Sequence, residues 1–145
     1  MKLLFQKLRK NAVLPVRATP QSAGADLCAC LDAPVTIQPG ETVMIPLGLT
    51  CQPAETDVAL LIFPRSGLAS KKGITLANAV GVVDSDYRGE WHVPLHNISA
   101  APFTVEHGMR VAQLVVVPVL FPEMMETDRV DATERGAGGF GSSGV

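Results

Sequence analysis

Residues 58–63 read VALLIF, and residues 111–120 read VAQLVVVPVL. Runs of this length and composition, rich in aliphatic and β-branched residues, are typical of β-strands. The first run holds no polar residue, and the second holds only Gln113 before Pro118. A strand with one face in water alternates polar and apolar residues. Both strands are therefore expected to be covered on both faces.

A chain of 145 residues forms about one domain with one core, so it has little material for a second cover. We therefore expect an oligomer in which these two strands pack around a shared axis. In that arrangement, neighbouring copies of the chain cover the outer faces of the strands.

The rest of the chain is broken into short pieces by 11 prolines and 13 glycines, which leave few windows long enough for a helix. Their regular recurrence favours an all-β sandwich or jelly roll over alternating strands and helices. Hairpin turns are expected at Pro39-Gly40 and His107-Gly108, and residues 66–72 are the best window for a short helix. Further strand-like runs lie at residues 42–45, 79–83, 91–95 and 102–105.

The composition argues against several classes of partner. The formal net charge is -2, and no cluster of Lys and Arg is long enough to bind nucleic acid or a membrane surface. No apolar stretch approaches the ~20 residues of a membrane span. The initial sequence MKLLFQKLRK lacks the apolar centre and cleavage site of a secretion signal. Cys28, Cys30 and Cys51 show no disulfide pattern, which is typical of reduced thiols in a cytoplasmic protein.

The C-terminal residues differ in character from the rest. Residues 131–145 read DATERGAGGFGSSGV and show no apolar periodicity. We expect a β domain over residues 1–131 and a glycine-rich arm over residues 132–145. Such an arm does not bury enough surface to order itself. Composition alone leaves two interpretations: a frayed terminus, or a mobile lid that grips a ligand with Arg135 and Phe140.

Three segments gather side chains that can carry chemistry. Residues 64–69, PRSGLA, place a guanidinium and a hydroxyl at the start of the expected helix, which is either an anion site or an ordinary turn. Residues 81–90, GVVDSDYRGE, crowd three carboxylates and Tyr87 into one turn. That turn is either a solvated hairpin or the site of a general base. Asp26 is either a turn residue or a carboxylate near a hard cation.

Two common kinds of site are missing from the sequence. His92 and His96 are separated by Pro94, and no Cys or carboxylate completes a zinc set with them. The sequence has no GxxxxGK(S/T) loop and no GxGxxG motif after a strand. The common glycine-rich loops that bind nucleotide phosphates are therefore not expected. Pro94 also deprives the strand expected at residues 91–95 of one hydrogen-bond donor, which leaves the role of His92 open.

Five segments together resemble the trimeric dUTPase family in its order and spacing. The resemblance runs from about Pro15 to the C-terminus. It implies an all-β, distorted jelly-roll fold of the β-clip, dUTPase-like kind, with a flexible C-terminal arm. It also implies a homotrimer whose active sites use residues of more than one subunit. The segments are AGADL, PRSGL, NAVGVVDSDYRG, GMRVAQL and RGAGGFGSSG, at residues 23–27, 64–68, 78–89, 108–114 and 135–144.

The reaction that the resemblance implies is the hydrolysis of dUTP to dUMP and pyrophosphate, which limits uracil in DNA and supplies dUMP for thymidylate synthesis. Asp84 would activate a water molecule for attack on the α-phosphorus. Tyr87 would pack against the deoxyribose and exclude a 2′-hydroxyl. The resemblance further implies Mg²⁺ as the cofactor, contacted by Asp26 through water.

The remaining contacts with substrate are also implied by the resemblance. Asn78, together with the backbone around Val82, Val83 and His92, would read the uracil edge. Gln113 is the one polar side chain in its apolar run, so a ligand contact explains it better than an unpaired buried amide. The phosphate chain would be held by Arg65, Ser66, Gly67 and Gln113.

The arm would close over the bound substrate. In the closed state Phe140 would stack on uracil, Arg135 would contact the terminal phosphate, and Gly141, Ser142 and Ser143 would lie near the phosphates. Closure orders a glycine-rich chain, and contacts with the substrate offset that cost.

Two other functions stay open at this point. An enzyme resembling dCTP deaminase would share the fold and bind a similar ligand, but those enzymes differ in the second and third segments. A non-catalytic nucleotide-binding or structural trimer of the same fold would be expected to lack Asp84 or the arm, and this sequence has both.

Overall fold

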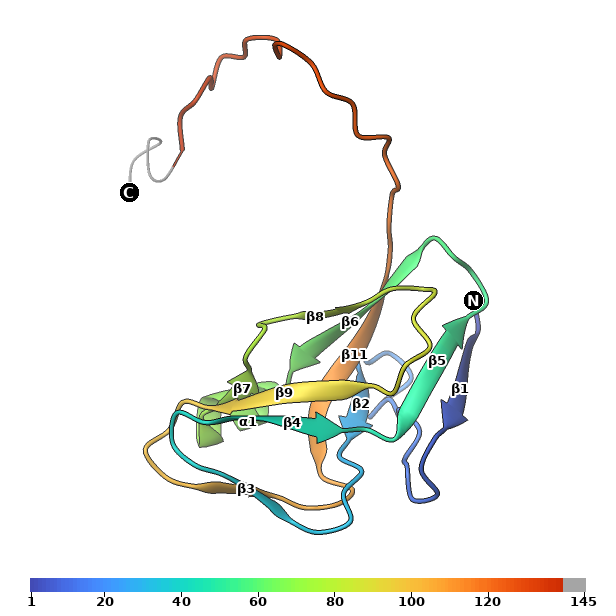
Figure 1. Cartoon of the computed structure of the whole chain (residues 1–145), viewed down its shortest axis with the longest axis vertical. Coiled ribbons are helices and arrows are strands. Elements are labelled where there is room, and N and C mark those ends of the chain that lie inside the picture. The colour runs from blue at the N-terminus through green and yellow to red at the C-terminus, as the bar shows by residue number, and fades with distance from the viewer. Residues whose placement is uncertain (140–145) are drawn as a thin grey trace.

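The computed structural model describes residues 1–139, which form eleven strands and one short helix (Figure 1). The all-β expectation is confirmed. In chain order the elements are β1 (Leu3–Lys7), β2 (Ala25–Cys28), β3 (Val35–Ile37), β4 (Thr42–Pro46), β5 (Leu49–Pro53), β6 (Val58–Pro64), α1 (Ser66–Lys72), β7 (Ile74–Leu76), β8 (Gly81–Val83), β9 (His92–Asn97), β10 (Phe103–Val105) and β11 (Arg110–Pro118).

The strands form small antiparallel sheets, as a distorted jelly roll requires. The largest has the order β2-β11-β6-β8, and a second has the order β4-β9-β7. Two further pairs, β1-β5 and β10-β3, complete the described part of the fold. Neighbours in these sheets are mostly distant in sequence, so the chain crosses repeatedly between layers.

The helix lies where the sequence places it. Arg65 has extended backbone angles and stands just before the first helical residue. The helix ends at Gly73, whose φ of 64° is left-handed and whose N–H caps the carbonyls of Leu68 and Ala69. A Cβ on Gly73 would lie 2.8 Å from the Cβ of Ser99. Glycine is therefore required here both for its backbone angle and for its small size.

Five strands were not predicted from the sequence, and the strand expected at residues 79–83 is shorter than predicted. β1, β2, β3, β5 and β7 were not predicted, because they are only three to five residues long and some carry polar residues. The run at 79–83 forms a strand only over Gly81–Val83. Ala79 instead adopts a left-handed φ of 59° in a tight turn.

Pro94 lies inside β9 and does not break it. The carbonyl of Pro94 accepts a hydrogen bond from the N–H of Ala77 at 2.9 Å. The N and O of one strand residue face the same neighbour, so the missing N–H of Pro94 also faces Ala77. Ala77 follows the last residue of β7, Leu76. The lost donor therefore falls just beyond the ladder between β7 and β9.

A main apolar core joins the sheets, and a small second cluster is formed by Ala12, Cys30 and Leu49. Trp91 is 2% exposed, and its ring packs edge-on against Phe5 of β1 with centroids 5.7 Å apart. Cys28, Cys30 and Cys51 are also buried, and none forms a disulfide. The largest fully buried aliphatic side chains are Leu27, Ile37, Ile45, Leu47, Leu49, Leu60, Ile74 and Leu95.

The β11-β6-β8 part of the large sheet has two different apolar faces. Leu60 and Leu114 face the core and are buried. On the opposite face Leu61 pairs with Val115 of β11 and with Val82 of β8. Leu61 and Val115 are only half-buried, and Val82 is 64% exposed. Residues 1–139 of one chain thus cover one face of these strands and leave the other open.

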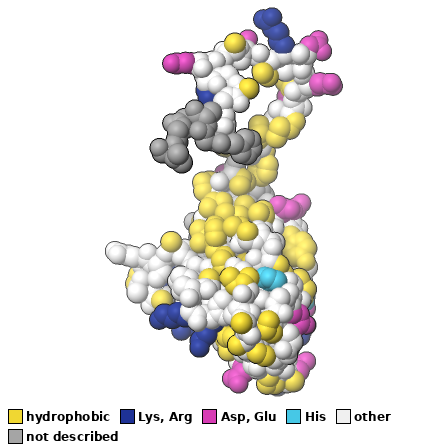
Figure 2. Space-filling model, turned by 90° about the vertical axis from the view of Figure 1, so that its left-hand side faces the viewer, with side chains coloured by type: hydrophobic (Ala, Val, Ile, Leu, Met, Phe, Trp, Pro, Cys, Tyr) yellow, Lys and Arg dark blue, Asp and Glu magenta, His cyan; other side chains and the backbone are white. Residues whose placement is uncertain are grey.

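After β11 the chain leaves the β domain. Residues 119–139 form no helix or strand and extend away from the sheets (Figure 1). Hydrophobic side chains gather where this segment departs (Figure 2). Leu120 is 92% exposed and Phe121 is 76% exposed. No helix within residues 1–139 is long and apolar enough to cross a membrane.

Candidate active site

The residues expected to bind the pyrimidine and the attacking water line one cavity. Its volume is about 310 Å³, and it lies between β8 and the start of β9. Asp84 follows β8 directly, and His92 opens β9. The predicted residues in its wall are Asn78, Val82, Val83, Asp84, Tyr87 and His92.

The residues expected to bind phosphate line a second cavity, of about 400 Å³. Asp26, Arg65, Ser66, Gly67 and Gln113 all belong to its wall. Among the residues that the structure describes, none lines both cavities. One chain therefore gathers the predicted site residues into two groups rather than one.

Arg65 is fixed at the junction between β6 and α1. Its Nε lies 2.9 Å from Oδ1 of Asp26, and one terminal nitrogen donates to the carbonyl of Arg110 at 3.3 Å. Asp26 lies on β2, on the far side of β11 from β6. The ion pair thus spans the middle strand of the sheet and holds the guanidinium against its surface.

A second arginine contacts the same carboxylate. One terminal nitrogen of Arg110 lies 3.1 Å from Oδ2 of Asp26. The ladder between β11 and β2 is irregular between Arg110 and Ala112, and such irregularities redirect side chains near sites. Two guanidinium groups around one carboxylate leave a net positive charge in the cavity. This arrangement favours an anionic ligand.

Gln113 has a partner within the chain. Its Nε2 donates to the carbonyl of Pro64 at 2.9 Å. A Cβ on Gly24 would lie 2.6 Å from Oε1 of Gln113, so a larger residue at position 24 would displace the end of this amide side chain. The amide is therefore not an unpaired buried group, which removes one argument made from the sequence for a ligand contact. Gln113 nevertheless lines the cavity, and Oε1 keeps capacity to accept a hydrogen bond.

A compact turn presents Asp84 and Tyr87. The N–H of Tyr87 donates to the carbonyl of Asp84 at 3.2 Å, and the hydroxyl of Ser85 donates to the carbonyl of Thr56 at 2.9 Å. A Cβ on Gly89 would clash with the ring of Tyr87. Asp84 is exposed and forms no ion pair within residues 1–139. Its carboxylate is therefore free to accept a proton or orient water.

The opposite wall of this cavity holds Asn78 and His92. The N–H of Val80 donates to the carbonyl of Asn78 at 2.6 Å, across the left-handed Ala79. A non-glycine residue in this region costs about 1–2 kcal/mol, and such strain concentrates at functional sites. Nδ1 of His92 lies 3.1 Å from the carbonyl oxygen of Glu90.

Some residues of the two cavities were not predicted as site residues. Glu90 and Met44 line the first cavity, and Arg110 and Gly24 line the second. Glu90, Arg110 and Gly24 lie in or beside the segments singled out in the sequence, which could have pointed to them. Met44 belongs to a plain strand run and gave no signal.

The arm residues do not lie in either cavity as far as they are described. Arg135 is exposed, and its Nε donates to the carbonyl of Gly138 at 2.9 Å. Phe140, Gly141, Ser142 and Ser143 lie outside the described residues.

A divalent cation fits the second cavity only if water molecules and substrate phosphates, rather than protein side chains, supply most of its ligands. Within residues 1–139 no group of three His, Cys, Asp or Glu side chains could enclose a metal. Asp26 offers a single carboxylate that already faces two arginines. This donor set suits Mg²⁺, which keeps several waters and binds substrate phosphates with one or two carboxylates.

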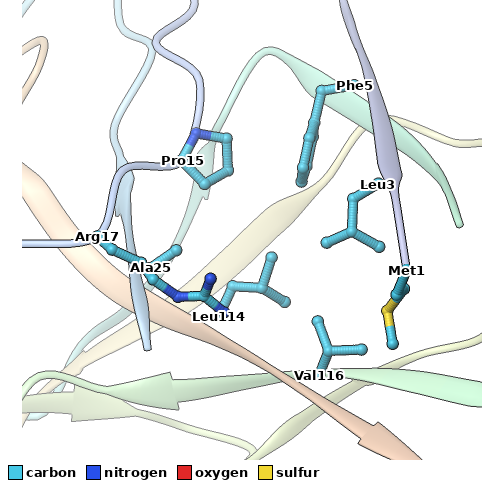
Figure 3. Close-up of a pocket in the computed structure, with 8 residues that line it drawn as sticks. All are labelled: Met1, Leu3, Phe5, Pro15, Arg17, Ala25, Leu114 and Val116. Atoms are coloured by element: carbon cyan, nitrogen blue, oxygen red, sulfur yellow. The ribbon is translucent and has the colours of Figure 1, made fainter. Parts of the chain in front are cut away.

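A separate cavity of about 500 Å³ is lined by none of the predicted site residues that lie within residues 1–139. Met1, Leu3 and Phe5 form one wall, and Leu114 and Val116 face them (Figure 3). Arg17 is the one charged side chain among the described residues that line it, and a guanidinium that stays protonated does not serve in proton transfer. This cavity is therefore not part of the candidate active site.

The fold and the two cavities define a class: an all-β protein with one net-cationic cavity and a second cavity that carries an exposed carboxylate and an aromatic ring. The cationic cavity suits an anionic group, and the second cavity offers a carboxylate and a flat ring to a neighbouring ligand. The sequence model of the dUTPase family matches residues 10–144. The chain belongs to the dUTPase family.

Curated relatives match along the whole chain. The chain is 49% identical to the deoxyuridine 5'-triphosphate nucleotidohydrolase of Serratia proteamaculans over 144 residues, covering 99% of this chain and 95% of the relative. The enzyme of the same name from Desulfitobacterium hafniense is 49% identical over 145 residues, covering 100% and 96%.

A solved structure shows the same fold. The dUTPase of Staphylococcus bacteriophage 80alpha with dUPNHPP superimposes with a TM-score of 0.89 at 27% identity, covering 99% of both chains. This agreement confirms the dUTPase-like form of the jelly roll that was expected from the sequence.

Proposed function

We propose that this protein hydrolyses dUTP to dUMP and pyrophosphate. The observation that carries the proposal is the division of its cavities in a chain of the dUTPase family: one presents a carboxylate beside an aromatic ring, and the other presents paired arginines. The first suits a nucleoside, and the second suits a triphosphate chain. The reaction would limit uracil in DNA and supply dUMP for thymidylate synthesis, in the cytoplasm.

Asp84 is the proposed general base. Its exposed carboxylate stands at the edge of the nucleoside cavity, where it takes a proton from the water that attacks the α-phosphorus. Positioned bases of this kind contribute about 10²–10⁴-fold to rate. Attack breaks the bond to the bridging oxygen, and pyrophosphate leaves.

Recognition of deoxyuridine falls to the walls of the same cavity. Tyr87 packs its ring against the deoxyribose and leaves no room for a 2′-hydroxyl. Asn78 and the backbone around Val82, Val83 and His92 read the polar edge of uracil.

The phosphate chain binds in the second cavity. Arg65 is already oriented by Asp26, so it loses little freedom when it binds a phosphate. The hydroxyl of Ser66, the backbone at Gly67 and the amide of Gln113 complete the contacts. Mg²⁺, held by phosphates and water with Asp26 near that water, supplies charge neutralisation when bound.

We further propose a homotrimer in which the two cavities of neighbouring copies complete each site. The open apolar face of β11, β6 and β8, with Val82 at its edge, supports this arrangement. An exposed apolar face of this kind is typical of protein interfaces. Sedimentation should give about three times the 15.3 kDa of one chain.

The arm over residues 132–145 is proposed as the lid of this site. Arg135 would contact the terminal phosphate, and Phe140 would stack on uracil, with Gly141, Ser142 and Ser143 near the phosphates. A lid that closes only over substrate excludes water and reopens on product release.

The decisive test measures pyrophosphate release from dUTP, UTP, dTTP and dCTP, with Mg²⁺ and with a chelator. Release from dUTP alone, lost on chelation, is the expected result. Ammonia release from dCTP would instead indicate a deaminase. Binding of dUTP without any release would indicate a non-catalytic nucleotide-binding trimer.

A further inference from the structure

Arg9 and Glu90 form a two-point ion pair across 81 positions of sequence. Nε of Arg9 lies 2.7 Å from Oε1 of Glu90, and a terminal nitrogen donates to Oε2 at 3.3 Å. Glu90 lines the nucleoside cavity, whereas Arg9 lines neither site cavity. The pair therefore links the N-terminal segment to the wall of the site.

The backbone of Arg9 is fixed by the loop at Gly48. The N–H groups of Leu8 and Arg9 both donate to the carbonyl of Gly48, at 2.8 and 3.3 Å. The carbonyl of Arg9 also accepts a hydrogen bond from the N–H of Ala12 at 3.1 Å. Arg9 thus reaches Glu90 from a hydrogen-bonded segment rather than from a loose terminus.

A second contact ties the same two segments. Phe5 of β1 packs edge-on against Trp91, the residue after Glu90. The N-terminal segment therefore holds both the charged and the aromatic member of the pair Glu90-Trp91. Two independent contacts to adjacent residues restrict the backbone between them.

The backbone of Glu90 positions two proposed substrate contacts. Its carbonyl oxygen accepts a hydrogen bond from the hydroxyl of Tyr87 at 3.4 Å and lies 3.1 Å from Nδ1 of His92. A displacement of Glu90 would consequently move both the ring expected to meet the sugar and the strand start expected to meet uracil.

We infer that Arg9 and Glu90 are a positioning pair that sets the width of the nucleoside cavity. This inference rests on the proposed hydrolysis of dUTP and adds a specificity determinant to it. Arg9 acts through Glu90, and Glu90 acts through Tyr87 and His92. Loss of the pair widens the cavity, weakens dUTP binding and reduces discrimination against UTP, while the water-activating Asp84 keeps its place.

Loss of the ion pair between Arg9 and Glu90 should not act only through a lower stability of the fold. The side chains of Arg9 and Glu90 are 38% and 23% exposed, and partly exposed ion pairs contribute only about 0–1 kcal/mol to stability. A change in KM without a matching fall in Tm would therefore report positioning rather than unfolding.

The test compares Arg9→Gln, Glu90→Gln and the double variant with the parent, using steady-state kinetics on dUTP and UTP. Each single variant should raise KM for dUTP about 5–10-fold and change kcat by less than about 3-fold, as expected for lost uniform binding. The preference for dUTP over UTP should fall. The double variant should match the singles, since residues that act as one unit are not additive.

Two further variants provide controls. Arg9→Lys keeps the positive charge but lacks the two-nitrogen fork of arginine. Its KM for dUTP should therefore lie between the values of the parent and of Arg9→Gln. Lys10→Gln removes an exposed neighbouring charge and should leave KM and the dUTP preference unchanged. Trp91 is the only tryptophan in the chain, so its fluorescence reports nucleotide binding at this cavity independently of turnover.

The outcomes separate the two proposals. An inactive parent would overturn the proposed function. With an active parent, an unchanged KM in both single variants would overturn the positioning role. Strictly additive increases in KM in the double variant would also overturn the positioning role. A KM change that follows the fall in Tm and appears equally in Lys10→Gln would overturn it as well.

Discussion

Asp26 of β2 and Arg65 at the start of α1 form an ion pair, with Oδ1 2.9 Å from Nε. The same carboxylate holds Arg110 at 3.1 Å. One acidic residue thus orients two cations that would otherwise repel each other. The position of Asp26 also places it near the expected phosphates, so its loss should disturb both arginine geometry and metal use.

Asp26→Asn should raise KM for dUTP and the Mg²⁺ concentration for half-maximal rate, each by about 10-fold. The reason is that supporting carboxylates of this kind typically contribute 10–100-fold to metal affinity or activity. Titration of activity with Mg²⁺ measures the effect. Asp32→Asn, a carboxylate outside both cavities, is the matched control. An unchanged Mg²⁺ requirement in Asp26→Asn would contradict the role given to Asp26.

Asp84→Asn should lower kcat by at least about 100-fold and leave binding largely intact, because the amide cannot accept a proton from water. Single-turnover pyrophosphate release gives the rate, and Trp91 fluorescence gives the affinity. Asp86→Asn alters a neighbouring carboxylate that is absent from the nucleoside cavity and should retain most activity. Parent-like turnover in Asp84→Asn would refute the assignment of the base.

Truncation after Asp131 should leave the fold intact and reduce turnover severely. β11 ends at Pro118, so no strand is removed, whereas the proposed lid is lost. Circular dichroism and sedimentation check the fold and the proposed trimer, and the pyrophosphate assay checks activity. Unfolding of the truncated chain would show that the arm is structural. Full activity would show that it is not a lid.

Asn97→Ala should destabilise the fold by about 2–4 kcal/mol. Asn97 is fully buried, and its Nδ2 donates to the carbonyls of Ile37 and Ala101 at 3.0 and 2.8 Å. Its Oδ1 accepts from the backbone N–H of Ser99 at 2.9 Å. Alanine would leave the buried carbonyl of Ile37 without this donor and would remove the amide's contacts with Ala101 and the half-buried Ser99. Denaturant unfolding measures the loss, and the exposed Asn11→Ala should change stability by less than about 0.5 kcal/mol.

Stability should fall at alkaline pH because of Cys51. Burial raises the pKa of this thiol from 9.0 to about 11. The unfolded chain loses the thiol proton at lower pH than the folded chain. The contribution of the protonated Cys51 to the free energy of unfolding is therefore complete below pH 9 and is lost as pH rises towards 11. Unfolding at pH 8 and pH 10.5 should show a larger loss for the parent than for Cys51→Ala. Equal losses of stability in the parent and in Cys51→Ala would contradict the raised pKa of Cys51.

Local signals predicted several elements correctly. The helix α1 was recognisable because a proline and an arginine precede a short polar window that ends at Gly73. β6 and β11 were recognisable as long apolar runs. β1, β2, β3, β5 and β7 were missed because segments of three to five residues carry too little pattern, some of them with polar residues. Ala79 was assigned to a strand because alanine gives no sign of a left-handed turn.

The candidate site, like the strands, was predictable only in part from the sequence. Residue type alone specifies the chemical groups available, including Asp84, Tyr87 and Arg65, because it fixes charge, shape and proton affinity. The packing of the fold is what brings Asp26 to two arginines, brings Arg9 to Glu90, and separates the two cavities within one chain. Local propensity acts over a few residues, whereas these contacts join residues that are far apart in sequence. Their geometry is set by how the sheets pack, which no short stretch of sequence records.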